Sequence, residues 1–198
     1  MTDPALHLAE QQLAEQHLRG LADTATRTAD TMSGDIARIA VLVMATLERG
    51  GKLMFCGNGG SAADAQHLAT EYVVRFQRDR RPYAALALTT DTSLLTAAAN
   101  DIGFDRVFAR QVEALGNAGD LLFLHSTSGE SQNLLAAAEA ARAAGVVTVA
   151  MLARGGGRLR HAVDHALVVP TDDGAHAQEL HLAAGHAICG IVDAMLET

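Results

Sequence analysis

Few folds can accommodate the pattern that begins at Lys52, where short apolar runs alternate with longer segments of helical periodicity. The apolar runs predict buried strands at residues 52–56, 84–88, 121–125, 146–151 and 165–169. The remaining segments predict helices at residues 61–76, 93–100, 105–116, 131–144, 157–162 and 176–196. Because such alternation builds parallel sheets, we expect an α/β fold: a doubly wound five-stranded parallel sheet flanked by helices. Ligands of such sheets bind at the carboxyl ends of the strands.

Residues 1–50 precede this alternation and have helical patterns only. Pro4 can begin one helix, and Ser33 can begin a second. The two helices carry more apolar surface than one sheet edge needs, so we expect part of it to be buried against another copy of the chain. We therefore predict a single domain over residues 1–198, with the N-terminal helical pair in oligomer contacts and residues 51–198 as an αβα sandwich.

The composition limits the classes of partner. A formal net charge of −8 argues against nucleic acid, which would need clustered Lys and Arg, and favours a small molecule. No uncharged apolar run is long enough to span a bilayer, so we expect no membrane partner. The two cysteines, Cys56 and Cys189, are too few for a disulfide framework, which favours a reducing cytoplasm.

A glycine-rich loop follows the first predicted strand. Gly57, Gly59 and Gly60 carry no side chain that would block a ligand, and Ser61 with Asp64 resembles a helix N-cap and its partner. The helix start offers N–H donors to an anion such as a phosphate. The same glycines with Ala62 also match the dinucleotide pattern G-x-G-x-x-A, for which Asp91 is the nearest acidic candidate.

A second polar loop follows the third predicted strand and is rich in hydroxyls: Ser126, Thr127, Ser128 and Ser131. Hydroxyls and helix N–H groups can together satisfy the oxygens of a phosphate without any basic residue. Glu130 lies within this loop, and its charge would repel a phosphate unless the side chain points to solvent.

Two groups of candidate metal ligands lie on predicted helices. His67 and Glu71 share one helix face by their i, i+4 spacing, and an imidazole with a carboxylate suits zinc. On the last helix, His186 can share a face with Glu179 or with Gln178, and the spacing alone favours Glu179. The residues themselves leave this choice open.

Four stretches of the chain resemble the phosphoheptose isomerases, a family within the sugar isomerase (SIS) domain group. They are CGNGGSAADAQH with Glu71, STSGES after a strand, Asn100-Asp101 ahead of Gly103-Phe104, and Gln178-Glu179 with His186. The resemblance implies an SIS-type, flavodoxin-like fold, one zinc ion per subunit and a homotetramer. It also implies conversion of sedoheptulose 7-phosphate to D-glycero-D-manno-heptose 7-phosphate, the first step of nucleotide-activated heptose synthesis for lipopolysaccharide, capsule or other glycans.

The resemblance implies roles for individual residues. The metal ligands would be His67, Glu71, Gln178 and His186. The substrate would contact Asn58, Gly59, Gly60, Glu71, Arg75, Asn100, Asp101, Ser126, Thr127, Ser128, Ser131 and Gln178. An aldose–ketose isomerase moves a proton between two carbons through an enediol, and we assign Glu71 as the base and His186 as its catalytic partner. Glu130 departs from the family, in which a neutral or basic residue takes that place.

Two other classes of function compete with the isomerase. A non-catalytic SIS-domain binding protein, such as a replication-initiator adaptor or a sugar-phosphate sensor, would keep the loops. The adaptor lacks the helix carboxylate and the final histidine, whereas this chain has both Glu71 and His186. A sensor would normally need a DNA-binding head, for which residues 1–50 have too little positive charge. We therefore predict an enzyme.

Overall fold

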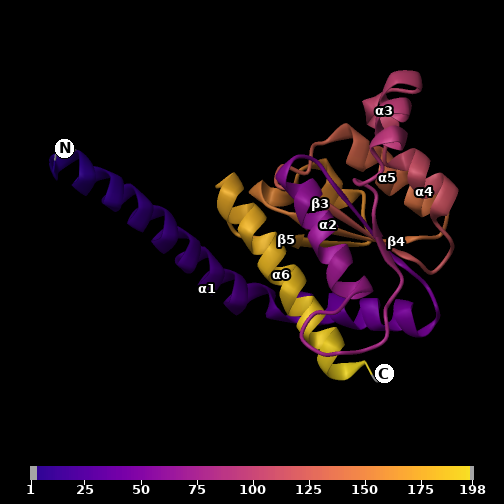
Figure 1. The fold of residues 1–198 in the computed structure, drawn as a ribbon, viewed down its shortest axis with the longest axis horizontal. Helices are drawn as coiled ribbons and strands as arrows, with labels where there is room; N and C mark the ends of the chain where they lie inside the picture. The colour runs from indigo at the N-terminus through magenta and orange to yellow at the C-terminus, as the bar shows by residue number, and fades with distance from the viewer. Residues whose placement is uncertain (1–3, 197–198) are drawn as a thin grey trace.

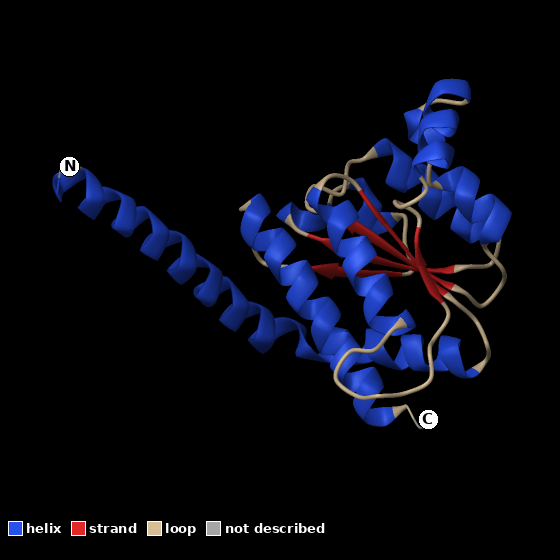
Figure 2. Cartoon of the chain, in the orientation of Figure 1, coloured by secondary structure: helices blue, strands red, loops and turns tan. Residues whose placement is uncertain are grey.

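The computed structural model describes residues 4–196, and these contain one five-stranded parallel sheet. Its strands are β1 (Leu53–Gly57), β2 (Ala85–Ala87), β3 (Leu121–Ser126), β4 (Val147–Leu152) and β5 (His165–Val168). They lie in the order β2-β1-β3-β4-β5. Figure 2 shows the sheet in red among the blue helices. The chain places β2 on one side of β1 and returns to the other side for β3, so the winding reverses between β1 and β3. This order confirms the predicted doubly wound sheet.

Helices cover both faces of the sheet (Figure 1). One face carries α1 (Pro4–Glu48), α2 (Gly60–Val73) and α6 (Gly174–Met195), and the other carries α3 (Thr92–Asp101), α4 (Ala109–Leu115) and α5 (Gln132–Ala143). Short 3-10 turns at Phe104–Arg106 and Arg158–His161 replace parts of the helices predicted at residues 105–116 and 157–162, and a third turn, Arg154–Gly156, precedes the latter. Gly155, Gly156 and Gly157 have positive φ angles that do not fit an α-helix, so none begins there. Among the described residues, no helix is both long and apolar enough to cross a bilayer.

The prediction of two N-terminal helices was wrong, because α1 is one helix of 45 residues. Ser33 and Gly34 resemble a helix boundary, but each costs a helix interior only about 0.5–1 kcal/mol. Met32 and Ile39, on either side of them, are both buried in the core and hold the helix together there. Further towards the N-terminus, residues 8–19 are exposed, and this part of α1 projects from the body (Figure 1).

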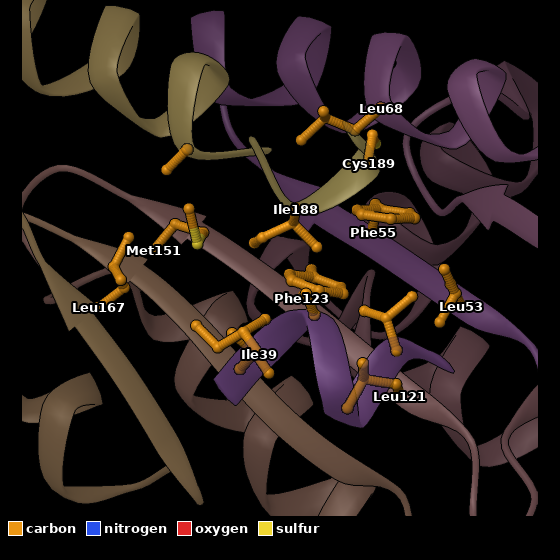
Figure 3. Close-up of a cluster of buried hydrophobic side chains, with 14 of the residues drawn as sticks. Ile39, Leu53, Phe55, Leu68, Leu121, Phe123, Met151, Leu167, Ile188 and Cys189 are labelled. Carbon is orange, nitrogen blue, oxygen red and sulfur yellow. The ribbon is translucent and has the colours of Figure 1, made fainter. Parts of the chain in front are cut away.

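Alternate strand residues point to opposite faces of the sheet and form two cores. Leu53 and Phe55 of β1 pack with α1, α2 and α6, as Figure 3 shows, whereas Met54 and Cys56 pack with α4 and α5. The ring of Phe55 stacks on that of Phe123, with centroids 4.9 Å apart. Every residue of β1 and β3 is buried, which explains why their sequences read as continuous apolar runs.

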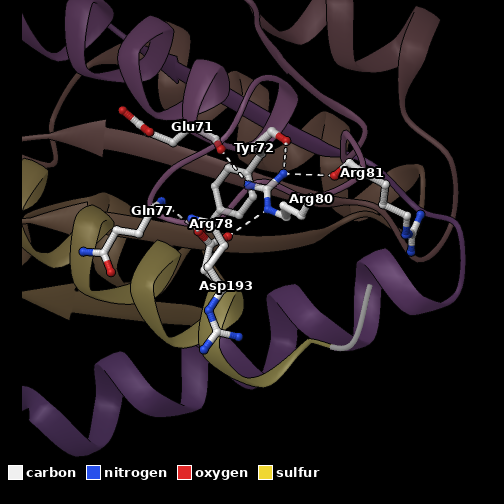
Figure 4. Close-up of polar contacts among 7 residues, drawn as sticks. All are labelled: Glu71, Tyr72, Gln77, Arg78, Arg80, Arg81 and Asp193. Carbon is white, nitrogen blue, oxygen red and sulfur yellow. Dashed lines mark hydrogen bonds and ion pairs between the residues drawn. The ribbon is translucent and has the colours of Figure 1, made fainter.

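A buried ion pair closes the C-terminal end of α2 (Figure 4). Arg80 Nε lies 2.8 Å from Asp193 Oδ1, and both side chains are only 3% exposed. The other guanidinium nitrogens of Arg80 donate to the carbonyl oxygens of Glu71 and Tyr72, at 2.7 and 2.9 Å. These carbonyls belong to the last turn of the helix, which has no helical donors left for them. Arg80 therefore attaches the end of α2, including Glu71, to α6.

Candidate functional site

The two polar loops lie side by side where the winding of the sheet reverses. The first loop, residues 57–60, begins at the last residue of β1, and the second, residues 126–131, begins at the last residue of β3, the neighbouring strand. The side chains of Asn58 and Asn133 connect the loops through two hydrogen bonds, 3.0 and 2.8 Å long. The sequence analysis missed Asn133, because a polar residue in the first turn of a helix usually faces water, whereas Asn133 is 2% exposed. The reversal point is where such sheets bind ligands.

The first loop differs from its prediction. The residue that caps α2 is Gly59, with φ 55°, and it makes no side-chain hydrogen bond, so the expected cap at Ser61 is wrong. Ser61 lies inside the helix, and its N–H donates to the Asn58 carbonyl oxygen at 3.1 Å. A Cβ atom at Gly57 would lie 2.7 Å from the Ser61 carbonyl oxygen, so the tight turn requires glycine there.

The second loop retains free donors at the start of α5. Ser126 Oγ accepts a hydrogen bond from the Gly129 N–H at 3.0 Å, and this bond shapes the loop. Ser131 is the cap residue of α5, yet its hydroxyl makes no capping bond. The first N–H groups of α5 therefore have no side-chain partner, and an anion there would be stabilised by them and by the positive end of the helix dipole.

The acidic residue of the second loop is neutralised by an arginine. Arg158 Nε donates to Glu130 Oε2 at 2.7 Å, and the Arg158 N–H donates to Oε1 at 3.0 Å. These hydrogen bonds from Arg158 lower the pKa of the Glu130 carboxyl, which lies exposed at the surface. The pair removes most of the repulsion that the sequence suggested between Glu130 and a bound phosphate.

Three of the four predicted metal ligands converge between α2 and α6. His67 Nε2 lies 2.9 Å from His186 Nε2 and 3.2 Å from Glu71 Oε1. Zinc with Zn–N distances of about 2.0–2.1 Å holds tetrahedral ligand atoms about 3.3 Å apart, so these spacings fit one shared ion. The ring of Phe76 stacks on that of His186, with centroids 5.4 Å apart, and holds the imidazole in place. The donor set therefore suits a divalent transition metal ion.

The fourth predicted ligand, Gln178, lies beside the first loop. Its amide donates to Asp64 Oδ1 at 3.2 Å, and a Cβ atom at Gly60 would lie 2.3 Å from its Oε1. The role of Gln178 as a metal ligand stays a prediction. To reach the ion, its side chain would have to turn away from Asp64. The sequence analysis treated Asp64 only as a capping partner, yet it is buried, and this burial raises its pKa against the opposing effects of Gln178 and His67. Asp64 thus holds the side chain of Gln178 beside the first loop.

Several other candidates lie elsewhere. Glu179, which the helical spacing favoured as a partner of His186, points instead to His17 of α1. Asn100 and Asp101 are exposed at the end of α3, where they bond to each other at 2.7 Å, and Figure 1 shows α3 well apart from α2. Arg75 is exposed just beyond α2. Asp91, the acidic candidate for a dinucleotide, caps α3 by accepting from the Leu94 N–H at 2.9 Å.

The profile of the SIS domain family matches residues 16–153. A phosphoheptose isomerase from Roseiflexus is 52% identical over 174 residues, which are 88% of each chain. Another, from Nitratidesulfovibrio vulgaris, is 46% identical over 196 residues, which cover 99% of this chain and 92% of the relative. The chain belongs to the phosphoheptose isomerase family of SIS-domain proteins.

Solved structures of this family have the same fold. The phosphoheptose isomerase from Neisseria gonorrhoeae superimposes with a TM-score of 0.89 at 39% identity, covering 93% of this chain and 99% of the other. The enzyme from Francisella tularensis gives a TM-score of 0.91 at 36% identity, covering 93% and 98% of the two chains. The predicted family and the predicted fold are thereby confirmed.

Proposed function

We propose that this chain is an aldose–ketose isomerase that converts sedoheptulose 7-phosphate to D-glycero-D-manno-heptose 7-phosphate. The observation that carries the proposal is the convergence of His67, Glu71 and His186 in a chain about half identical to phosphoheptose isomerases, with two polar loops at the reversal point of the sheet. His67 is seven residues along α2 from Gly60, a rise of about 10 Å. This distance is comparable with the length of an extended seven-carbon sugar phosphate.

The hydroxyl-rich loop would hold the phosphate. Ser126, Thr127, Ser128 and Ser131 surround the start of α5, and each hydrogen bond to the charged phosphate would contribute about 1.5–3 kcal/mol to binding. Asn58 and the glycines Gly59 and Gly60 would line the sugar between this loop and the metal-ligand group. With the phosphate fixed at one end, carbons 1 and 2 of the sugar would lie at the group around Glu71.

The reaction needs no oxidant, because it moves hydrogen within one molecule. Glu71 would remove a proton from carbon 1 of the ketose, and His186 would give a proton to the oxygen on carbon 2, which produces an enediol. Loss of the proton from the oxygen on carbon 1 and return of a proton to carbon 2 complete the aldose. Zinc held by His67, Glu71, His186 and Gln178 would stabilise negative charge on the two oxygens. Glu71 would act as the base only while it is not bound to such an ion.

We also propose a cytoplasmic homotetramer. Leu8, Leu13 and Leu18 on the projecting part of α1 are 58–67% exposed, and apolar side chains at this density suit a contact between copies of the chain. Such contacts could bring Arg75, Asn100 and Asp101 of one copy to the site of another, which would give these exposed residues their predicted role. The free, buried cysteines Cys56 and Cys189 are compatible with the reducing cytoplasm.

The test is isomerisation of sedoheptulose 7-phosphate, followed by NMR of the product. Glu71→Gln should lower kcat at least about 100-fold, because the amide keeps the size of the carboxylate but cannot accept a proton. Glu113→Gln, the same change at an exposed residue of α4, is the matched control and should keep wild-type activity. Zinc content is measured for each variant. Near wild-type turnover by a Glu71→Gln protein that retains its metal would refute the role of Glu71, and an inactive wild type with metal bound would favour the non-catalytic binding protein.

A further inference from the structure

A second cluster of possible metal ligands lies between α1 and α6, separate from the group around His67. It consists of His17, His176 and Glu179, whose ligand atoms all lie within 4.8 Å of one another. His17 Nε2 is 3.5 Å from Glu179 Oε1, and the two imidazole rings have centroids 4.6 Å apart. His176 lies ten residues from His186 on α6, a rise of about 15 Å, so the two clusters cannot share one ion.

The hydrogen bond of His176 occupies one ring nitrogen, Nε2, and leaves the other, Nδ1, available to a metal ion. Its Nε2 lies 3.1 Å from the carbonyl oxygen of His17. A carbonyl oxygen can only accept, so Nε2 carries the hydrogen and Nδ1 keeps its lone pair. Histidines that bind metals usually donate their other N–H to a carbonyl or carboxylate in this way, which fixes the ring and its tautomer.

The surroundings hold one ligand rigidly and leave the other two adjustable. His176 is buried, and a Cβ atom at Gly20 would lie 2.9 Å from its Cε1, so the ring packs directly on the backbone of α1. The side chains of His17 and Glu179 are 44% and 43% exposed. They can therefore close by the roughly 1 Å that a zinc ion requires, and an ion can enter from solvent.

We propose that His17, His176 and Glu179 bind a divalent transition metal ion such as zinc, with water completing the coordination. Two imidazoles and a carboxylate form a donor set that such ions prefer over calcium or magnesium. The site lies where α1 leaves the body, since residues 8–19 are exposed and Thr24 is the first buried residue after them. The ion would fasten the base of the projecting segment to α6. This inference does not rest on the isomerase activity.

The experiment measures zinc bound per chain, by mass spectrometry, after metal-free protein without an affinity tag is equilibrated with zinc and dialysed. His17→Ala and Glu179→Ala should each lose about one zinc per chain relative to wild type. His161→Ala, which removes an exposed histidine elsewhere, is the matched control and should lose none. His67→Ala should lose the other ion and retain this one.

A second readout is the melting temperature. Zinc should raise it for wild type and His67→Ala by a margin that Glu179→Ala does not show, because only an intact cluster joins α1 to α6. Circular dichroism verifies that the variants fold, and Glu179→Ala provides the test should His17→Ala fail to fold. Wild-type zinc content in a folded Glu179→Ala protein would overturn the proposal, and so would a wild type that binds only the zinc lost in His67→Ala.

Discussion

Asp193→Asn should destabilise the protein strongly, because it breaks the buried ion pair with Arg80. Asp193 accepts hydrogen bonds from Arg80 Nε and from the N–H groups of Gln77 and Arg78, at 2.8, 2.9 and 3.2 Å. Asparagine has one acceptor oxygen, so it cannot satisfy all three donors, and the guanidinium stays buried without a counter-charge. Removing one partner of such a pair costs about 3–5 kcal/mol of unfolding free energy.

In a chain of this length, 1 kcal/mol shifts the melting temperature by about 2–4 °C, so the expected loss is roughly 6–20 °C. Differential scanning calorimetry at fixed protein concentration measures it. Asp35→Asn breaks an exposed ion pair with Arg38 and is the control, with an expected cost below about 1 kcal/mol. A melting temperature of Asp193→Asn within about 3 °C of wild type would refute the reasoning from the buried pair.

The same substitution should change the response to acid. Burial alone would raise the pKa of Asp193, but hydrogen bonds from Arg80, Gln77 and Arg78 hold it below its ordinary value. The pKa is lower in the folded protein than in the unfolded chain. The contribution of the Asp193 carboxylate to the free energy of unfolding is therefore fully present above the unfolded pKa of about 3.9. This contribution is lost as the pH falls through the folded pKa. The stability difference between wild type and Asp193→Asn should therefore narrow below about pH 4.

Two further predictions concern the phosphate loop and the assembly. Arg158→Ala should raise KM for the sugar phosphate roughly fivefold at low salt and less at high salt, because Glu130 then faces the phosphate without its counter-charge. The double variant Glu130→Gln/Arg158→Ala should return KM to near the wild-type value, and a KM that stays raised in it would contradict the electrostatic explanation. Leu13→Glu together with Leu18→Glu should break the proposed tetramer into smaller species in light scattering, because both exposed leucines would carry charge into the contact. A wild type that is a stable monomer at micromolar concentration would remove the basis for this prediction.

The sheet could be predicted from the sequence because its central strands β1 and β3 are buried on both faces. No residue of β1 or β3 is exposed, so their sequences are continuous apolar runs without polar residues in alternation. Such short runs are typical of strands that are buried on both faces. The continuity of α1 could not be predicted in this way. Ser33 and Gly34 look like a helix boundary, and only the burial of Met32 and Ile39 on the same sheet face decides against one.

In the candidate site too, contacts within one element could be predicted from the sequence, and contacts between elements could not. The contact of His67 with Glu71 follows from their spacing on one helix, whereas the approach of His186 depends on how α6 packs against α2. The direction of Glu179 depends on His17 of α1, which is distant in the sequence, and spacing within α6 contains no information about it. The bond between Asn58 and Asn133 joins residues 75 positions apart, so only the folded sheet reveals it.

The uninterrupted helix α1 has a consequence for how this chain can change in evolution. A loop absorbs an inserted or deleted residue locally, but a continuous helix transmits it. One residue added near Ser33 would rotate everything before it by about 100° and advance it by about 1.5 Å. His17 would leave the face that meets α6, and the exposed leucines would point in a new direction. Length variation should therefore be tolerated in α1 before His17 and in the loops of the sheet, and excluded from residues 20–48.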